Sequence, residues 1–281
     1  MRWVLAARPR TLPAALVPVA VGATLVRPAS IDWLNSVLCV VIALALQIGT
    51  NYANDYSDGI RGTDEARIGP FRLTASKLVS APWVRRAAWG WFALAALAGI
   101  WLSSRTTWWL VIIGLSAILA GWFYTGGPKP YGYFGFGELF VMVYFGFVAT
   151  VATSYVQHGL VSSSSWWLGL ATGAMACALL EANNLRDVDG DRVAGKKTLA
   201  ARLGRERASW LYAICVALVA LGVALGGEPL VALAAIVLYA PGLRIAFSPR
   251  TGRELIALLQ VSARAQLLSG AILVGVFAAT R

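Results

Sequence analysis

Long apolar stretches constrain this chain more than any other feature of its sequence. An α-helix needs roughly 17–25 residues to cross a bilayer, and nine apolar stretches of about that length occur among the 281 residues. They lie at 12–26, 34–50, 87–102, 107–124, 138–157, 166–182, 209–225, 229–247 and 263–279. We therefore predict an all-α integral membrane protein whose residues 1–281 form a single domain of nine transmembrane helices.

The composition agrees with this class and argues against a soluble enzyme. Hydrophobic residues make up 58% of the chain and charged residues 13%, against roughly 45–50% and about 25% in soluble domains. The 12 Trp and 28 Gly residues point the same way, because Trp favours membrane interfaces and Gly is common in spanning helices.

The distribution of positive charge predicts the orientation in the membrane. The chain has 24 Lys and Arg residues and a formal net charge of +11. With nine spans, all of them except Arg27, Arg105 and Arg281 fall on the side of the N-terminus. Because Lys- and Arg-rich loops stay cytoplasmic, we expect a bacterial-type plasma-membrane protein with its N-terminus inside and its C-terminus outside. Topology then accounts for the charge, and no nucleic-acid partner is expected.

Two connectors on the expected cytoplasmic side begin with acidic and amide residues at helical spacing. The first stripe contains Asn51, Asn54, Asp55 and Asp58, at positions i, i+3, i+4 and i+7. These four side chains share one face if the helix continues past Thr50. A ring-like helical bundle could place this stripe opposite a similar one across a single cavity.

The second stripe follows the sixth apolar stretch. Its members are Asn183, Asn184, Asp187 and Asp191. Carboxylates crowded at a membrane boundary repel one another, so a positive partner is expected. Oxygen ligands suit Mg²⁺, which usually binds one or two carboxylates together with substrate phosphates. The two stripes therefore fit a diphosphate held by Mg²⁺.

Basic residues follow both stripes and are natural partners for phosphate oxygens. They are Arg61, Arg72 and Lys77 after the first stripe, and Arg186, within the second stripe, with Lys196 and Lys197 after it. A diphosphate bound here would keep a lipid-soluble tail among the helices, as a polyprenyl diphosphate would. Two alternatives remain open: the acidic residues are solvated helix caps, and the basic residues, Lys77, Lys197 and Arg61 among them, reflect only the cytoplasmic charge bias.

A third segment, 124–138, lies on the same side and is predicted to be a loop that covers the substrate. It contains Tyr124, Lys129, Tyr131, Tyr133 and Glu138. Tyrosine hydroxyls beside a cavity could orient an aromatic acceptor or take a proton. The alternative is an aromatic belt at the membrane interface.

Two further features bear on packing and on functional class. Gly169 and Gly173 form a G-x-x-x-G pair, which predicts close approach of another helix.

A secondary transporter is the competing functional class, but transporter sites lie near the bilayer midplane, whereas the acidic residues here lie at the ends of the apolar stretches.

Taken together, these motifs resemble the UbiA-type intramembrane aromatic prenyltransferases. Most similar are the 1,4-dihydroxy-2-naphthoate polyprenyltransferases of menaquinone synthesis. The resemblance rests on R-P-R-T-L-P-A-A-L-V-P-V from Arg8, N-Y-A-N-D-Y-S-D-G-I-R-G-T-D from Asn51, Y-G-Y-F-G-F-G-E from Tyr131 and N-N-L-R-D-V-D-G-D-R-V-A-G-K-K-T-L-A from Asn183. Where that subfamily often reads G-P-x-R-A-T-A-S-G, this chain ends the motif with Lys77.

The resemblance implies a bundle of nine helices around a central cavity open to lipid, with two Mg²⁺ ions bridging a diphosphate. Carried over to this sequence, the metal ligands and catalytic carboxylates would be Asp55, Asp58, Asp187 and Asp191. Substrate-binding residues would be Asn51, Asn54, Asn184, Arg72 and Lys129, with Asp64 as a further carboxylate. Two further expectations rest on position alone: Arg186 binds substrate beside the second stripe, and Tyr131 or Tyr124 in the covering loop takes a catalytic part by positioning the acceptor or helping to deprotonate it.

The implied reaction joins a polyprenyl chain to 1,4-dihydroxy-2-naphthoate with loss of diphosphate and CO₂, giving demethylmenaquinone. Membrane lipid would surround the tail. Other acceptors, namely 4-hydroxybenzoate, homogentisate or a glycerol phosphate lipid, would use the same diphosphate machinery and stay open at this point.

Overall fold

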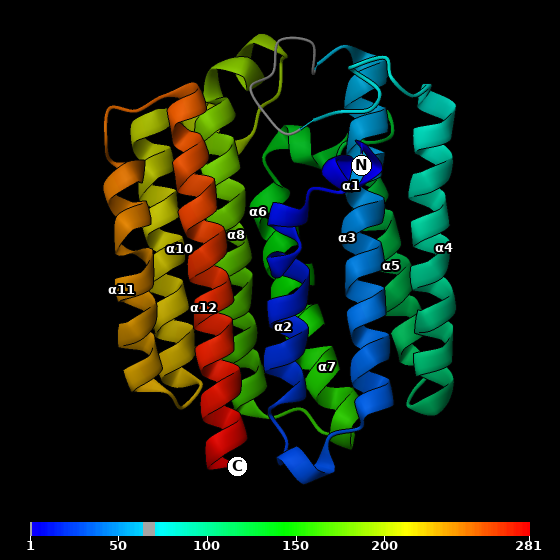
Figure 1. Cartoon of the computed structure of the whole chain (residues 1–281), viewed down its shortest axis with the longest axis vertical. Coiled ribbons are helices and arrows are strands. Elements are labelled where there is room, and N and C mark those ends of the chain that lie inside the picture. Colours follow the sequence, from blue (N-terminus) through cyan, green and yellow to red (C-terminus); the bar gives the residue numbers. More distant parts are fainter. Residues whose placement is uncertain (1, 64–70) are drawn as a thin grey trace.

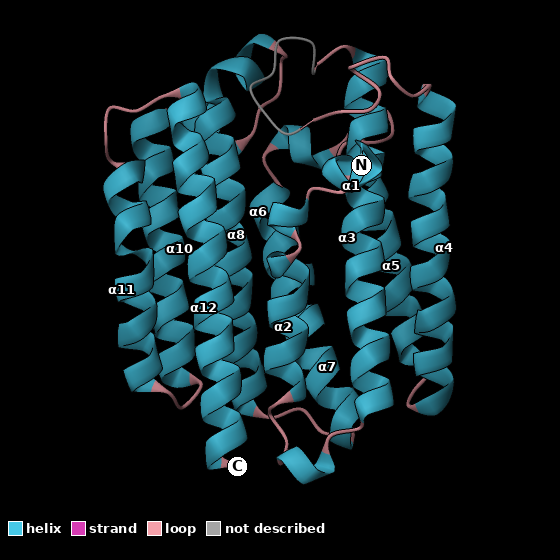
Figure 2. Ribbon diagram, viewed as in Figure 1, coloured by secondary structure: helices cyan, strands magenta, loops and turns pink. Residues whose placement is uncertain are grey.

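The computed structural model describes residues 2–63 and 71–281, and within them every regular element is a helix (Figure 2). The first half comprises α1 (Arg2–Ala6), η1 (Pro9–Thr11), α2 (Pro13–Ala23), η2 (Pro28–Ser30), α3 (Trp33–Arg61), α4 (Ala81–Arg105), α5 (Trp109–Phe123) and η3 (Tyr131–Phe134). The second half comprises α6 (Gly137–Val141), η4 (Met142–Val148), α7 (Ala149–His158), α8 (Ser163–Val193), α9 (Leu199–Leu203), α10 (Arg205–Leu225), α11 (Pro229–Ala246), η5 (Gly252–Leu255) and α12 (Ile256–Thr280). The predicted all-α class is confirmed.

The predicted count of nine spans is not recovered in full. Among the described residues, six helices are long and apolar enough to cross a membrane, and a seventh results if the pair Arg2–Thr11 and Pro13–Ala23, bent by 52°, is one span. Helix α5 has 15 residues, about 22 Å of helix, which is short for a core about 30 Å thick. Helix α8 ends in the polar second stripe and begins with three consecutive serines.

Exposed tryptophans mark both ends of the bundle. One set lies where α3 and α8 begin and where α4 meets α5: Trp33, Trp101, Trp108, Trp109, Trp166 and Trp167. At the other end Trp83 and Trp210 are exposed near the starts of α4 and α10. Such belts place aromatic rings at the two membrane interfaces. The C-terminus lies at the first of these ends, and the N-terminus toward the other (Figure 1).

Two continuous helices carry the acidic stripes to the same end of the bundle. Helix α3 begins after Asp32, whose side chain accepts the Asn35 backbone N–H, and ends before Gly62, which adopts the left-handed conformation at φ 71°. It therefore continues past Thr50, as the first stripe requires. Helix α8 likewise runs without a break through the second stripe to Val193.

The helices divide into a solid half and a hollow half. A large hydrophobic core joins α8, α10, α11 and α12 with part of α2. Gly146, in the π-helical segment η4, approaches α8 so closely that a Cβ there would lie 2.5 Å from the Gly169 carbonyl oxygen and 2.7 Å from Gly173 Cα. The close helix approach predicted from Gly169 and Gly173 is confirmed.

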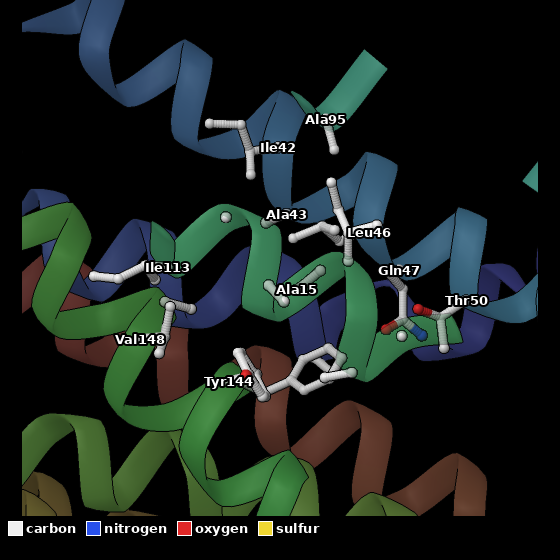
Figure 3. A pocket seen from close by; sticks show the side chains of 18 of the residues that line it. Ala15, Ile42, Ala43, Leu46, Gln47, Thr50, Ala95, Ile113, Tyr144 and Val148 are labelled. Carbon is white, nitrogen blue, oxygen red and sulfur yellow. The ribbon is translucent and has the colours of Figure 1, made fainter. Parts of the chain in front are cut away.

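A cavity of about 500 Å³ occupies the other half. Helices α2, α3, α4 and α5, the bent segment α6–η4–α7 and one edge of α8 line it. Figure 3 shows Gln47 and Tyr144 on opposite walls, with aliphatic side chains such as Ile42 and Leu46 along its length. The wall is apolar over most of its length, as a binding site for a hydrocarbon chain requires.

Candidate active site

Asp55 of the first stripe is buried and holds a neighbouring segment in place. Its two carboxylate oxygens accept hydrogen bonds from the backbone N–H groups of Leu73, at 2.7 Å, and Thr74, at 2.9 Å. The side chain is 1% exposed. Asp55 therefore fixes the segment after residue 70 against α3, in addition to its predicted role as a metal ligand.

Asp58, one turn further along α3, is a meeting point of three segments. Its oxygens lie 3.3 Å from Arg72 Nη2 and 3.4 Å from Lys196 Nζ, and it accepts a hydrogen bond of 2.6 Å from the Tyr133 hydroxyl. Lys196 follows the second stripe and Tyr133 belongs to the 124–138 segment. Asp58 of the first stripe thus contacts both the 124–138 segment and the connector that directly follows the second stripe.

The second stripe is likewise surrounded by donors. Arg186 binds Asp187 through two hydrogen bonds of 2.7 Å, and Thr198 Oγ1 lies 3.4 Å from Asp191 Oδ2. Such bidentate contacts are among the strong ion pairs of proteins. The predicted phosphate-binding Arg186 therefore lies at the predicted site, where it now partners a carboxylate.

Tyr133 connects the first stripe to the connector that follows the second. Its carbonyl accepts the Lys197 backbone N–H at 2.8 Å, and its ring lies 4.8 Å from Lys196 Nζ. Burial and the neighbouring Asp58 raise the pKa of the Tyr133 phenol above its ordinary value, so the hydroxyl remains a donor at neutral pH. The sequence singled out this segment but not this residue's contact with Asp58.

The three predicted amides form hydrogen bonds to neighbouring segments of the chain. Asn51 Nδ2 donates to the Ala7 carbonyl at 2.9 Å, Asn54 Oδ1 accepts from Thr125 Oγ1 at 2.7 Å, and Asn184 Nδ2 donates to Glu138 Oε1 at 2.9 Å. Asn51 and Asn54 also line the cavity. Each amide ties an acidic helix to a segment distant in the sequence.

An aromatic row lines the cavity below the acidic stripes. The Tyr131 ring lies 5.5 Å from Tyr124 and stacks on Phe140 at 3.9 Å, and Phe140 in turn lies 6.2 Å from Tyr144, centroid to centroid. The Tyr131 hydroxyl donates to the Ala120 carbonyl at 2.9 Å. Burial raises the pKa of this phenol, so Tyr131 is suited to orienting a ring rather than to accepting a proton.

Several predicted residues are not brought into this cluster. Lys129 and Lys77 are exposed, and neither side chain forms a hydrogen bond or ion pair within the part of the chain that the structure describes. Arg61 borders the cluster: its guanidinium lies 5.6 Å from the centroid of the Tyr133 ring, and it donates to the carbonyls of Thr125 and Gly127. Asp64 lies outside the described residues.

Other lining residues escaped the sequence interpretation. Arg8 lines the cavity, but in sequence it is one of several basic residues near the N-terminus. Phe140 and Tyr144 were hidden inside an apolar stretch. Their spacing of four residues, which places both on one helix face, is the signal that could have found them.

The donor set fits Mg²⁺ only with help from a ligand. Among residues 2–63 and 71–281, no three His, Cys, Asp or Glu side chains lie close enough to hold a metal ion by themselves. The buried carboxylates are hard oxygen ligands, and Mg²⁺ commonly completes its coordination with substrate phosphates. The residues therefore suit ions shared with a diphosphate rather than a protein-only metal cage.

Comparisons with known proteins agree with this geometry. A 1,4-dihydroxy-2-naphthoate octaprenyltransferase of Mycobacterium tuberculosis is 45% identical over 287 residues, covering 99% of this chain and 97% of the relative. A protein of the same name from Escherichia coli is 35% identical, covering 77% of this chain and 75% of its own.

Solved structures share the fold. A UbiA homologue from Archaeoglobus fulgidus bound to DMAPP and Mg²⁺ aligns with a TM-score of 0.66 at 17% identity, covering 98% of this chain and all of that one. An apo UbiA homologue from Aeropyrum pernix aligns with a TM-score of 0.68 at 14% identity over 95% of both chains. Residues 15–277 match the UbiA prenyltransferase family. With that match and relatives of this identity and coverage, the resemblance inferred from the motifs is confirmed, and the chain belongs to the UbiA prenyltransferase family.

Proposed function

We propose that the protein transfers a polyprenyl chain from polyprenyl diphosphate to 1,4-dihydroxy-2-naphthoate, with loss of diphosphate and CO₂. One observation carries the proposal: Asp58 of the first acidic stripe pairs with Lys196, which closely follows the second stripe, and Asn51, Asn54 and Asn183 of the two stripes line one long apolar cavity together with an aromatic row. This arrangement offers a place for each part of the reaction, namely the diphosphate, the tail and the ring. The names of the relatives favour this acceptor and an octaprenyl donor.

The diphosphate binds between the stripes in this proposal. Asp55, Asp58, Asp187 and Asp191 hold two Mg²⁺ ions, assisted by Asn51, Asn54 and Asn184, while Arg72 and Arg186 contact phosphate oxygens; Lys129 is a further candidate for that contact. Arg72 forms a buried ion pair with Asp58, and Arg186 forms one with Asp187. These pairs keep both guanidinium groups at the site in the absence of a ligand. When bound, Mg²⁺ neutralises the charge that grows on the departing diphosphate.

The chemistry proceeds in the dry part of the site. The allylic C–O bond of the donor breaks, and the electron-rich ring forms a C–C bond at the carbon that carries the carboxylate. The pair of electrons in the bond to the carboxylate then returns to the ring as CO₂ leaves, so this step needs no proton acceptor. Tyr131 and Tyr124 orient the ring, and the apolar wall excludes water from the cation.

The proposal also covers how the protein lies in the membrane. The cavity opens to lipid, which accommodates the rest of the tail, and the bundle crosses a bacterial plasma membrane nine times with the acidic stripes on the cytoplasmic side. The exposed tryptophans at both ends and the bacterial relatives support this placement.

The test is prenyl transfer by the detergent-solubilised protein supplied with octaprenyl diphosphate, Mg²⁺ and either 1,4-dihydroxy-2-naphthoate or 4-hydroxybenzoate. We expect Mg²⁺-dependent formation of prenylated naphthalene-1,4-diol, the reduced form of demethylmenaquinone. Asp187→Ala and Asp55→Ala should abolish it. Asp189→Ala is the matched control, because Asp189 lies on the same helix but is exposed. Transfer to 4-hydroxybenzoate alone would assign another acceptor, and no transfer to either would overturn the proposal.

A further inference from the structure

A second cavity lies beside the cavity of about 500 Å³, which we call the main cavity. The second cavity has a volume of about 360 Å³ and lies between the beginning of α5, the η4–α7 segment and the beginning of α8. Apart from Thr107 and Tyr155, the described residues that line it have aliphatic, phenylalanine or tryptophan side chains. Trp109 and Trp166 are exposed at its rim, which places it at the end of the bundle opposite the acidic stripes.

The wall between the two cavities is one residue thick. Among the described residues, four line both cavities: Leu110 and Ile113 of α5, Val148 at the end of η4, and Ala152 of α7. Ile113 and Val148 lie at the end of the main cavity away from Gln47 (Figure 3). Exposed side chains change rotamer within picoseconds to nanoseconds, so this wall can open without the movement of a helix.

Helix α5 is weakly enclosed where the two cavities meet. Of its 15 residues, all of which the structure describes, only Ala120 is buried. Ile113 is 36% exposed although it lines the main cavity. A Cβ added to Gly114, which also lines the main cavity, would meet no atom within 4 Å. The boundary between α5 and α7 is therefore a place where a flexible chain can pass.

Close helix contacts close other boundaries of the main cavity. A Cβ on Gly22 of α2 would lie 2.5 Å from the Thr150 carbonyl oxygen of α7. A Cβ on Gly121 of α5 would lie 2.5 Å from Thr50 Oγ1 of α3. Helix α5 is thus held against α3 at the end near the acidic stripes, whereas its opposite end borders the second cavity.

The tail of the proposed donor is longer than the main cavity is deep. Each isoprene unit adds four carbon–carbon bonds of roughly 1.5 Å to the chain, so eight units span roughly 40 Å when extended. Along α3, the helix from Asn51 in the first stripe to Trp33, exposed at the opposite end, is about 27 Å long. An octaprenyl tail must therefore fold back on itself or leave through the wall.

We propose that the second cavity binds the terminal isoprene units of the donor's tail, which pass between α5 and α7 at Ile113 and Val148. This inference rests on the proposed function for the prenyl diphosphate donor. Val148 is the last residue of the π-helical segment η4, a rare type of helix that is frequent at functional sites. An apolar lining suits a hydrocarbon chain, and beyond Trp166 the tail continues into lipid of similar polarity.

Photolabelling tests where the tail lies. The probe is octaprenyl thiolodiphosphate, in which sulfur at the allylic carbon slows transfer, with a diazirine on the terminal isoprene unit. It is irradiated with the full-length protein and Mg²⁺ in detergent, and modified peptides are identified by mass spectrometry. We expect at least half of the label that excess octaprenyl diphosphate displaces to fall on residues of the second cavity alone, such as Phe147, Tyr155 and Trp166. A farnesyl probe with the same diazirine should label the main cavity instead.

The distribution of the label separates this inference from the proposed function. Displaceable label of the octaprenyl probe found only outside the second cavity would overturn the inference and leave the proposed function standing. No displaceable label anywhere would overturn both, because the donor itself would not bind. A wild-type protein that is labelled as expected but does not prenylate 1,4-dihydroxy-2-naphthoate would overturn the proposed acceptor alone.

A lipid probe distinguishes the donor from membrane lipid as the occupant of the second cavity. Phosphatidylglycerol with a diazirine at the end of one acyl chain is irradiated with the protein, with and without excess octaprenyl diphosphate. We expect octaprenyl diphosphate to reduce labelling of the second cavity by this lipid at least fivefold. Labelling that does not change would assign the cavity to lipid and contradict the proposal.

Filling the second cavity tests whether long donors need it. Thr107 lines the second cavity but not the main one. We expect Thr107→Trp to lower kcat/KM for octaprenyl diphosphate at least tenfold. For farnesyl diphosphate the change should be less than twofold, because three isoprene units span only roughly 15 Å.

The neighbouring threonine provides the matched control. Thr106 is exposed and lines neither cavity, so Thr106→Trp should leave kcat/KM for both donors within twofold of wild type. An equal loss with both donors in Thr107→Trp, unchanged use of octaprenyl diphosphate in that variant, or the same selective loss in Thr106→Trp would overturn the proposal.

Discussion

Lys196 Nζ lies 3.4 Å from Asp58 Oδ2, so a cation that follows the second acidic stripe is paired with a carboxylate of the first. Lys196→Gln removes the charge from a buried ion pair. We expect the free energy of unfolding to fall by about 1–3 kcal/mol, the cost of leaving a buried charged group short of a partner. Thermal unfolding in detergent measures this loss.

The neighbouring lysine provides the control for that experiment. Lys197 is exposed, so Lys197→Gln changes the net charge equally and should leave the melting temperature within about 1 °C of wild type, as expected for a surface substitution. Equal losses in the two variants would show that overall charge, rather than the contact with Asp58, is responsible.

Tyr133→Phe removes the hydrogen bond to Asp58 and keeps the ring beside Lys196. A hydrogen bond to a charged group is worth about 1.5–3 kcal/mol, so we expect prenyl transfer to fall by about tenfold or more. Initial rates at saturating donor and acceptor measure the effect. Full activity in Tyr133→Phe would remove Tyr133 from the site.

The raised pKa of Tyr133 predicts a further difference at alkaline pH. A group whose pKa is raised by folding contributes stability that is fully present below its ordinary pKa of about 10 and is lost at higher pH. Wild type should therefore lose more stability than Tyr133→Phe above pH 10, and the difference between them should be constant from pH 6 to 9. Melting temperatures across this range test the sign.

Gly99 of α4 lines the cavity, and a Cβ placed there would meet no atom within 4 Å. Gly99→Leu should fill cavity space without a clash. We expect it to reduce transfer from octaprenyl diphosphate at least tenfold more than transfer from farnesyl diphosphate, because the longer tail needs more of the cavity. Product analysis with the two donors measures the ratio.

Gly90 on the same helix offers the matched substitution. A Cβ added to Gly90 would likewise meet no atom within 4 Å, but this residue does not line the cavity. Gly90→Leu should leave the ratio of the two donors unchanged. A shift of similar size in both variants would attribute the effect to α4 as a helix rather than to the cavity.

Lys77 adopts φ 57°, at the position where the related sequences often have glycine. The left-handed conformation costs roughly 1–2 kcal/mol with a side chain, and glycine loses about 0.5–1 kcal/mol through its greater freedom when unfolded. Lys77→Gly should therefore raise the free energy of unfolding by about 0.5 kcal/mol. Lys77→Ala keeps the strain and should not, which thermal unfolding of the two variants will decide.

The acidic stripes could be predicted from the sequence because helical spacing alone places Asp55 and Asp58 on one face. The structure adds that α3 and α8 continue unbroken through both stripes. The number of spans could not be predicted in the same way, because a window of apolar residues does not reveal that α5 has only 15 helical residues.

The contacts between stripes could not be predicted in the same way. Lys196 reaches Asp58 and Tyr133 reaches the same carboxylate, but these pairings join residues more than 70 positions apart. They depend on how the helices pack, which no local pattern records. The position of Arg8 in the cavity wall could not be predicted for a different reason. The sequence does not distinguish a basic residue that lines a cavity from one that contributes only to the membrane orientation.

The division of the bundle into a solid and a hollow half has a consequence for how this architecture can diversify. Among the described residues, α10, α11 and α12 form much of the large hydrophobic core and contribute nothing to the cavity wall. Substitutions that adapt the cavity wall to another prenyl tail or another aromatic acceptor therefore fall mainly on helices outside α10, α11 and α12. New specificities can arise in such a protein at little cost to its folding.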